Sequence, residues 1–179
     1  PEHCFPNVGF RTATRLRMFL PVIRISTHQY CRHTSANGTI CGQHVDVSGM
    51  HALLCKSGGH VVRRHDAIRD TIAHILEGVE ASASGVMVEQ HSPDTTTENQ
   101  RPDVFFHDFR GRPKRIDIEV CTNHSTRTIG QYRPGALIET EEGVKRRKYR
   151  TLPLLPFVVS HLGRYGASAI TFIKMIFRD

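Results

Sequence analysis

The segment that most constrains the fold of this 179-residue chain is the stretch 31–60, which is rich in Cys, His and Gly and poor in large apolar residues. Such a segment cannot build a hydrophobic core of its own, so it needs a bound metal or a neighbouring domain. It contains the spacing C-x2-H-x6-H-x3-C, whose last two members lie four residues apart, on one face of a helical turn. Tetrahedral Zn²⁺ takes four such ligands. We therefore predict a zinc site formed by Cys41, His44, His51 and Cys55, with Cys31 and His33 as rivals for one position.

The alternative interpretation of this segment is a set of scattered histidines and buried thiols. The chain has five cysteines and twelve histidines, and no stretch with the features of a signal peptide. This combination favours thiols in a reducing compartment over disulfides. A group of three or more ligands within fifteen residues, in a segment too polar to fold unaided, favours the metal site.

The charge balance points to a polyanionic partner. Lys and Arg number 24 against 17 Asp and Glu, which gives a net charge of +7 and a pI near 9.5. Such a balance favours nucleic acid over a membrane surface. No apolar run approaches the ~20 residues of a membrane-spanning helix, so we expect no membrane partner.

Beyond residue 60 the hydrophobic pattern is that of an α/β domain. Apolar residues at helical spacing predict helices from 61 to about 78, at 136–150 and at 167–177. Apolar runs, clearest in RIDIEV with its alternating faces, predict strands at 86–89, 102–106, 115–120 and 154–163. The stretch 91–100 is expected to be a polar loop. The fold class that this order predicts is α/β, with a small mixed sheet flanked by helices.

We divide the chain into three parts. Residues 1–30 are interpreted as the remnant of an upstream region, either an incomplete piece of it or an edge strand. Residues 31–60 form a zinc-knuckle-like segment, and residues 61–179 form the α/β domain.

Acidic residues mark a candidate catalytic site in the α/β domain. Asp103 begins one predicted strand, and Asp117 and Glu119 share the outward face of the next. If these strands pair, the carboxylates converge and hold a hard cation such as Mg²⁺, which activates water and stabilises charge on a phosphate. The alternative is that they are ordinary solvent-facing acids of a hairpin.

A basic helix follows these acids. Lys145, Lys148 and Tyr149 share one of its faces. A lysine at that place can orient water or neutralise the transition state. The alternative is that the KRRK run is a solvated surface.

Seven short motifs occur in a specific order along the chain. They are CG…D…G-x-H-x-L-x-C, RRHDAIRD, VEQ, RPD, RIDIEVC, K-x-x-KY and PFVVSHLGRYG. From about Cys31 to about Gly166, this set resembles the C-terminal region of non-LTR retrotransposon polyproteins. In those proteins a reverse transcriptase is followed by a zinc knuckle and a restriction-like endonuclease of the PD-(D/E)XK fold.

The resemblance implies catalytic roles by position. Asp103, in an R-P-D motif, and Asp117, at the start of the third core strand, would bind the catalytic Mg²⁺. The lysine would come from the K-x-x-[KR]-Y helix, here Lys145 with Lys148 and Tyr149. Glu119 stands where a restriction enzyme has its lysine, and it either binds metal or faces solvent.

The resemblance also implies residues around this centre. Glu89 matches the glutamate of a V-E-P element on the first strand, with Gln90 in place of Pro. Arg64 and His65 match an R-H pair that holds nucleic acid or the knuckle. Further DNA contacts are expected from basic residues beside the motifs, namely Arg101, Arg146, Arg147 and Lys148.

Two departures from the family pattern matter. Its knuckle usually begins C-x-C-G, and Thr39 occupies the first of those positions here, which leaves the fourth zinc ligand open between His44 and Cys31. The chain also contains no YxDD polymerase box. The reverse transcriptase is therefore expected upstream in a larger protein.

The resemblance thus implies a Mg²⁺-dependent DNA endonuclease that nicks target DNA in the nucleus to prime reverse transcription. Its partners would be target DNA and element RNA. The alternative is a catalytically decayed fragment of the same polyprotein that only binds nucleic acid.

Overall fold

The computed structural model describes residues 7–18, 20–22, 30–79, 85–89, 101–108, 110–122, 135–150 and 152–177. The chain divides into two compact units, residues 1–63 and 64–179, which we describe separately. The predicted loop at 91–100 and Gln90 lie outside the described residues. The division at residues 30 and 60 stays a prediction.

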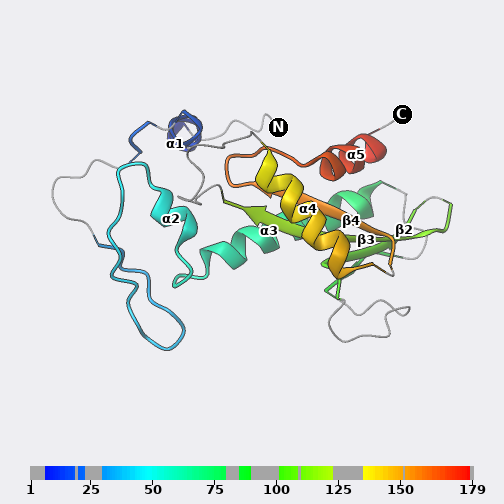
Figure 1. Ribbon diagram of the computed structural model, residues 1–179, viewed down its shortest axis with the longest axis horizontal. Coiled ribbons are helices and arrows are strands. Elements are labelled where there is room, and N and C mark those ends of the chain that lie inside the picture. Colours follow the sequence, from blue (N-terminus) through cyan, green and yellow to red (C-terminus); the bar gives the residue numbers. More distant parts are fainter. Residues whose placement is uncertain are drawn as a thin grey trace. The chain divides into compact units, whose positions relative to one another are not determined.

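The second unit contains a four-stranded mixed sheet (Figure 1). Its strands stand in chain order: β1 (Met87–Val88), β2 (Val104–His107), β3 (Pro113–Cys121) and β4 (Leu154–Ser160). Strand β2 is antiparallel to both β1 and β3, whereas β4 runs parallel to β3. A parallel neighbour requires a crossover connection, and helix α4 (Ala136–Lys148) lies in that connection. The predicted mixed sheet with flanking helices is confirmed.

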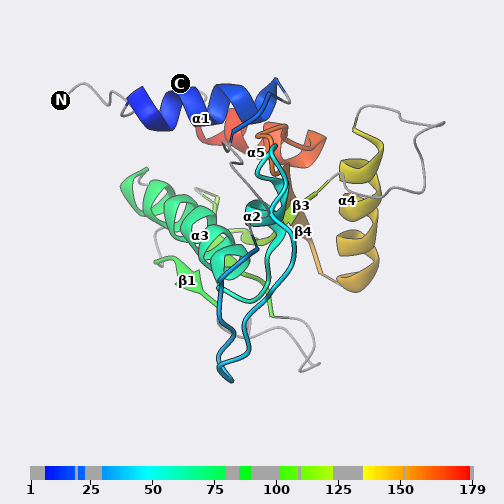
Figure 2. The same ribbon diagram turned by 90° about the vertical axis from the view of Figure 1, so that its left-hand side faces the viewer.

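Helices cover both faces of this sheet (Figure 2). On one face, α3 (His60–Gly78) and α5 (Ala167–Ile176) pack Leu76 and Phe172 against the sheet. On the other face, α4 packs Ile138 against Val158 and Cys121. The expected helices therefore agree with the structure to within a few residues.

The alternation of β3 decides which residues face α4. Because successive side chains of a strand point to opposite faces, Ile116 and Ile118 enter the α3/α5 core, while Asp117 and Glu119 lie on the α4 side. The expectation that Asp117 faces outward is wrong: it is 3 % exposed. The pattern of a single strand does not show that a later helix covers its polar face.

The first unit holds helix α1 (Asn7–Arg17), a two-stranded turn between Tyr30 and His44, and the short helix α2 (Met50–Leu54). Helix α1 was not predicted, since residues 1–30 were expected to be an incomplete piece of an upstream region or an edge strand. None of the described helices combines the length and the apolar character that crossing a membrane requires.

Candidate functional site

Asp103 and Asp117 meet at the start of the β2–β3 hairpin. Val104 pairs with Ile116, so continuing this antiparallel register by one residue places Asp103 opposite Asp117. The backbone N–H of Ile118 donates a hydrogen bond of 2.6 Å to Asp103 Oδ2. This contact holds the Asp103 carboxylate against the backbone of β3, at the residue that follows Asp117, and the two predicted strands are paired.

Lys145 of α4 joins the carboxylates. Its Nζ lies 2.5 Å from Asp117 Oδ2 and 3.1 Å from Glu119 Oε2. Burial alone would lower the pKa of Lys145, but these two carboxylates raise it, so the ammonium stays charged. Asp117 Oδ2 is buried and pairs with Lys145 by charge, without hydrogen-bond geometry.

Tyr149, the residue that follows α4, also contacts the site. The side chain is 1 % exposed, and its hydroxyl lies 2.7 Å from Asp117 Oδ1 and 2.9 Å from the carbonyl oxygen of Arg101. Burial, followed by the negative charge of Asp117, raises the pKa of Tyr149, so the hydroxyl keeps its proton and donates it. The predicted shared face of Lys145, Lys148 and Tyr149 is confirmed, since Lys148 Nζ also lies 3.9 Å from Asp117 Oδ1.

His65 of α3 contacts the site from another element. Its Nε2 lies 3.2 Å from Asp103 Oδ2. The hydrogen bond with Asp103 raises the pKa of His65 to about 9, so the ring is protonated at neutral pH. In turn, although burial alone would raise it, the pKa of Asp103 is lowered by His65 and by the Ile118 N–H. The sequence did not predict this pairing.

Glu89 is held at the edge of the site by two arginines. Its carboxylate pairs with Arg69 and lies 3.3 Å from Arg101 Nη2, and its backbone N–H donates to the Asp103 carbonyl. Glu89 has a φ of 50°, which non-glycine residues rarely adopt and which costs about 1–3 kcal/mol. Sequence reasoning missed Arg69; the available signal was its position four residues after His65, on the same helical face.

The expected DNA-contacting residues differ in their surroundings. Arg101 and Lys148 have about half of their side chains exposed, and Arg147 is exposed. Arg146 donates a hydrogen bond to Ser168 and pairs with Glu142, so it also ties α4 to α5. Arg64 is partly buried.

The first unit contains the metal-ligand cluster. The ligand atoms of Cys31, Cys41, His51 and Cys55 all lie within 4.8 Å of one another. Cys31 Sγ is 3.6 Å from Cys55 Sγ, and Cys41 Sγ is 3.5 Å from His51 Nε2. This Cys₃His cluster could hold a metal ion. Among the residues that the structure describes, this is the only group of three or more Cys, His, Asp or Glu side chains close enough together to hold one metal ion. The carboxylates around Asp117 do not form a second such group.

The cluster contains Cys31 and not His44, contrary to the preferred ligand set. Cys31 exchanges backbone hydrogen bonds with Gly42 and Gln43, which brings its thiol next to Cys41. His44 instead stands opposite Tyr30, with its ring edge-on at 6.1 Å. The spacing of ligands along the sequence favoured His44. It could not show that the backbone around Cys31 pairs with the backbone around Gln43, which brings Cys31 into the cluster instead.

Asp46 prepares the other half of the cluster. Its carboxylate accepts hydrogen bonds from the backbone N–H groups of Met50 and His51, at 3.0 and 2.7 Å, and from the Ser48 hydroxyl. Burial alone would raise the pKa of Asp46, but these hydrogen bonds lower it to about 2. They set the start of α2, from which His51 and Cys55 reach the cluster on one face, as predicted.

The thiols of the cluster differ in their tendency to ionise. Burial opposes ionisation at Cys55, but hydrogen bonds from the His33 side chain and the Ser57 backbone lower its pKa to about 6. Burial raises the pKa of Cys31. Because thiolates are the ligands of metals, Cys55 is the cysteine best prepared to bind one.

Comparisons of the chain with models of protein families, with curated proteins and with solved structures find no match. The site is therefore interpreted from its own geometry.

Proposed function

We propose that the acidic site of the second unit is the centre of a Mg²⁺-dependent DNA endonuclease with a restriction-endonuclease-like core. In this proposal the chain is the nicking portion of a non-LTR retrotransposon protein, acts in the nucleus, and cuts target DNA to prime reverse transcription. The supporting observation is that two aspartates and a lysine from distant parts of the sequence lie in one hydrogen-bonded and ion-paired network. Glu89 directly follows the first strand and Asp117 lies in the middle of the third, close to the places that the family resemblance implies, on the first strand and at the start of the third.

The residues present fit a divalent cation. Asp103 and Asp117 would hold Mg²⁺ through their carboxylate oxygens, the ligands that this ion prefers. Asp117 Oδ2, which pairs with the Lys145 ammonium at 2.5 Å, would exchange that partner for the ion. When bound, Mg²⁺ supplies the acidity that activates water and the positive charge that stabilises the phosphate under attack. Tyr149 and His65 hold the two carboxylates in place by hydrogen bonds. Lys145, charged and partly buried, neutralises charge that develops on the phosphate.

We also propose that the Cys₃His cluster holds a structural Zn²⁺. Three thiols and one imidazole are a usual tetrahedral zinc set, and this set closes the coordination sphere without an open position. The role is structural because the first unit has few buried apolar side chains among its described residues, namely Cys31, Met50 and Cys55.

A plasmid-nicking assay tests the endonuclease. Supercoiled plasmid is incubated with Mg²⁺ and either the wild-type chain, Asp117→Ala or Glu77→Ala, which removes an exposed acid of α3. We expect nicking by the wild type and by Glu77→Ala, and a loss of about 100-fold or more in Asp117→Ala. Equal nicking by all three chains would reject the site. Nicking by none of them, with DNA binding retained, would favour the fragment that only binds nucleic acid.

A further inference from the structure

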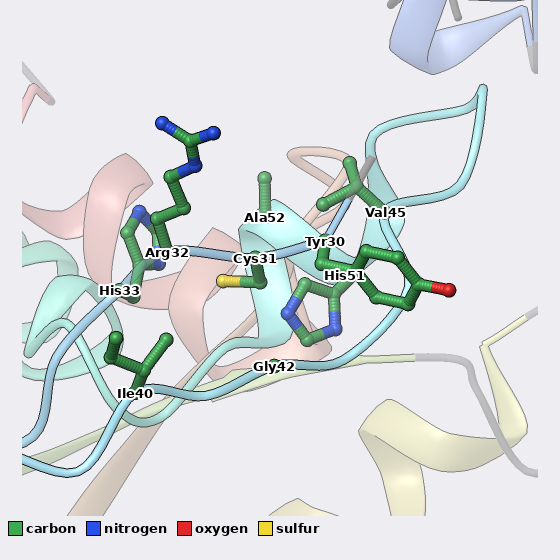
Figure 3. A pocket seen from close by; sticks show the side chains of 9 residues that line it. All are labelled: Tyr30, Cys31, Arg32, His33, Ile40, Gly42, Val45, His51 and Ala52. Carbon is green, nitrogen blue, oxygen red and sulfur yellow. The ribbon is translucent and has the colours of Figure 1, made fainter. Parts of the chain in front are cut away.

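The hairpin of the first unit ends in a turn at residues 35–39. Thr34 pairs with Ile40 where the two arms of the hairpin meet this turn. Figure 3 shows the arms beside the pocket that they line, with His33 on one arm and Ile40 on the other. The tip of the turn holds the pair Asn37-Gly38, and both residues are exposed. An amide side chain therefore stands next to a glycine backbone nitrogen in contact with water.

Asn37 is the one asparagine in the sequence that precedes a glycine. The other three, which precede Val, Gln and His, are Asn7, Asn99 and Asn123. Glycine has no Cβ to hinder a group that approaches its backbone nitrogen. At Gly38 the space that a Cβ would occupy is open, with no atom within 4 Å. The Gly38 nitrogen is therefore accessible to the Asn37 side chain.

Two hydrogen-bond donors of the turn face the amide oxygen of Asn37. The Thr39 N–H donates to Asn37 Oδ1 at 3.2 Å, which folds the side chain over the Gly38 backbone as an Asx turn. The Ser35 hydroxyl donates to the same oxygen at 2.5 Å. Its single proton is available for this contact, because its other acceptor, the Thr39 carbonyl, already accepts the Ser35 N–H. Donors so placed stabilise the negative charge that develops on the oxygen when a nucleophile attacks the amide carbon.

The Gly38 nitrogen is the nucleophile that follows this amide directly in the chain. Its N–H donates to the Ser35 carbonyl at 2.9 Å, and this hydrogen bond has to open before the nitrogen reacts. Because the tip of the turn is exposed, water replaces the bond at a small net cost. One contact opens while two donors remain on Asn37 Oδ1, so the balance of contacts favours attack.

We propose that Asn37 is a site of spontaneous deamidation. A solvent base takes the Gly38 N–H proton, and the nitrogen forms a bond with Asn37 Cγ. The bond from Cγ to Nδ2 breaks, and Nδ2 leaves as ammonia with a proton from water, which closes a cyclic succinimide. Water then opens either of the two ring C–N bonds and leaves aspartate or isoaspartate. Overall, one water is consumed and one ammonia is released.

Both products change the first unit. Each adds one negative charge to residues 1–63, which contain seven Lys and Arg against two Asp and Glu. In the isoaspartate the main chain runs through the former side chain, so the turn becomes one methylene longer. Such a turn does not keep the present spacing between Ser35 and Thr39, whose N–H and carbonyl are paired at 2.9 Å. The chemistry uses the turn alone, and it holds whether or not the acidic site of the second unit cuts DNA.

Peptide mapping tests this site in the full chain. The wild-type protein is kept folded at mildly alkaline pH in water labelled with heavy oxygen, then digested in ordinary water at intervals and analysed by tandem mass spectrometry. We expect Asn37 to gain a labelled oxygen as it loses ammonia, and isoaspartyl methyltransferase to modify the same peptide. The peptides that contain the other three asparagines should stay unchanged over that time. Equal conversion of all four asparagines, or none at Asn37, would overturn the proposal.

Two variants test the role of the turn. Ser35→Ala removes a donor to Asn37 Oδ1 and should slow the conversion about 2- to 10-fold. Thr34→Ala is the matched control, because it removes an exposed hydroxyl of the same hairpin that donates to the Arg32 carbonyl instead. We expect Thr34→Ala to convert Asn37 at the wild-type rate. Conversion in Ser35→Ala that is as fast as in the wild type, or faster, would overturn this geometry.

A comparison of the folded and unfolded wild-type chain needs no variant. In guanidinium chloride the turn is lost but the pair Asn37-Gly38 remains, so the unfolded chain reports the reactivity of the pair alone. We expect the folded chain to convert Asn37 about 2- to 10-fold faster, since the hydrogen bonds to Oδ1 exist in the folded turn. Equal or slower conversion in the folded chain would show that the turn does not promote the reaction, and would overturn the proposal.

Discussion

Tyr149 is the side chain on which the geometry of the acidic site depends most. Its hydroxyl is the hydrogen-bond donor near both Asp117 Oδ1 and the Arg101 carbonyl, inside a closed part of the molecule. Tyr149→Phe leaves the buried Asp117 Oδ1 without this donor, so we expect the free energy of unfolding to fall by about 1–3 kcal/mol. Urea denaturation measures this change.

The matched control is Tyr165→Phe, since the Tyr165 side chain is 46 % exposed. We expect this change to stay within about 0.5 kcal/mol. Equal destabilisation by the two substitutions would show that the buried hydroxyl has no special role.

Gly166 allows α5 to begin close to α4. A Cβ at this position would lie 2.3 Å from Glu142 Oε1 and 2.9 Å from Ile138 Cγ2, and Glu142 already accepts a hydrogen bond from the Ser168 N–H. Gly166→Ala should therefore destabilise the chain by about 1–3 kcal/mol. Gly143→Ala should stabilise it by about 0.5–1 kcal/mol, because Gly143 lies inside α4 and a Cβ there meets only the flexible end of Arg147. Thermal unfolding that ranks the two variants in the opposite order would contradict this packing.

At the residue scale, the sequence identified the carboxylates and the lysine but not their surroundings. Residue type and motif order pointed to Asp103, Asp117 and Lys145. The contacts of His65 and Arg69 could not be predicted, because they join α3 to residues twenty or more positions away. Such contacts depend on tertiary packing and leave no trace in local periodicity.

At the element scale, the turn of the β2–β3 hairpin sets the register that brings the two aspartates together. Asp108 accepts hydrogen bonds of 3.0 Å from the N–H groups of Arg110 and Arg112, and Arg112 pairs with it at 2.9 Å. Burial alone would raise the pKa of Asp108, but the bonds from Arg112 and Arg110 lower it to about 2. The arginine-containing turn between β2 and β3 is thus organised by an acid.

Because the pKa of Asp108 is lowered, the stability of the hairpin depends on pH. The folded pKa lies below the unfolded value, so the stabilisation is complete above about pH 4 and is lost as the pH falls toward 2. Urea midpoints measured from about pH 5 to pH 2.5 should fall less steeply in Asp108→Asn than in the wild type. Parallel curves for the two chains would exclude this contribution.

The zinc-ligand set makes a prediction for the first unit. We expect the purified chain to carry about one equivalent of zinc, as one tetrahedral site requires. Cys31→Ser removes a member of the cluster and should lose that metal, whereas His44→Ala should retain it. Metal analysis by mass spectrometry distinguishes this set from the one that spacing alone favoured. Retention of zinc by Cys31→Ser together with its loss from His44→Ala would reverse the assignment.

For the whole molecule, the order of elements was predictable and the position of the polar faces was not. Periods of two and 3.6 residues located the strands and helices of the second unit, since each buries one apolar face. Asp117 was expected on the surface because one strand contains no information about α4, which follows it after a long connection. Helix α1 was missed because the apolar run after it and Pro21 dominated the local pattern.

The central claim for the whole molecule is that Asp103 and Asp117 serve one cutting centre. A double-mutant cycle on the rate constant of plasmid nicking, with Asp103→Asn, Asp117→Asn and both together, tests this most directly. Residues that act as a unit have strongly non-additive effects. We predict that each single change slows nicking by about 100-fold or more and that the double change slows it no further. Single effects that multiply in the double variant, or single variants that nick as fast as the wild type, would contradict the account.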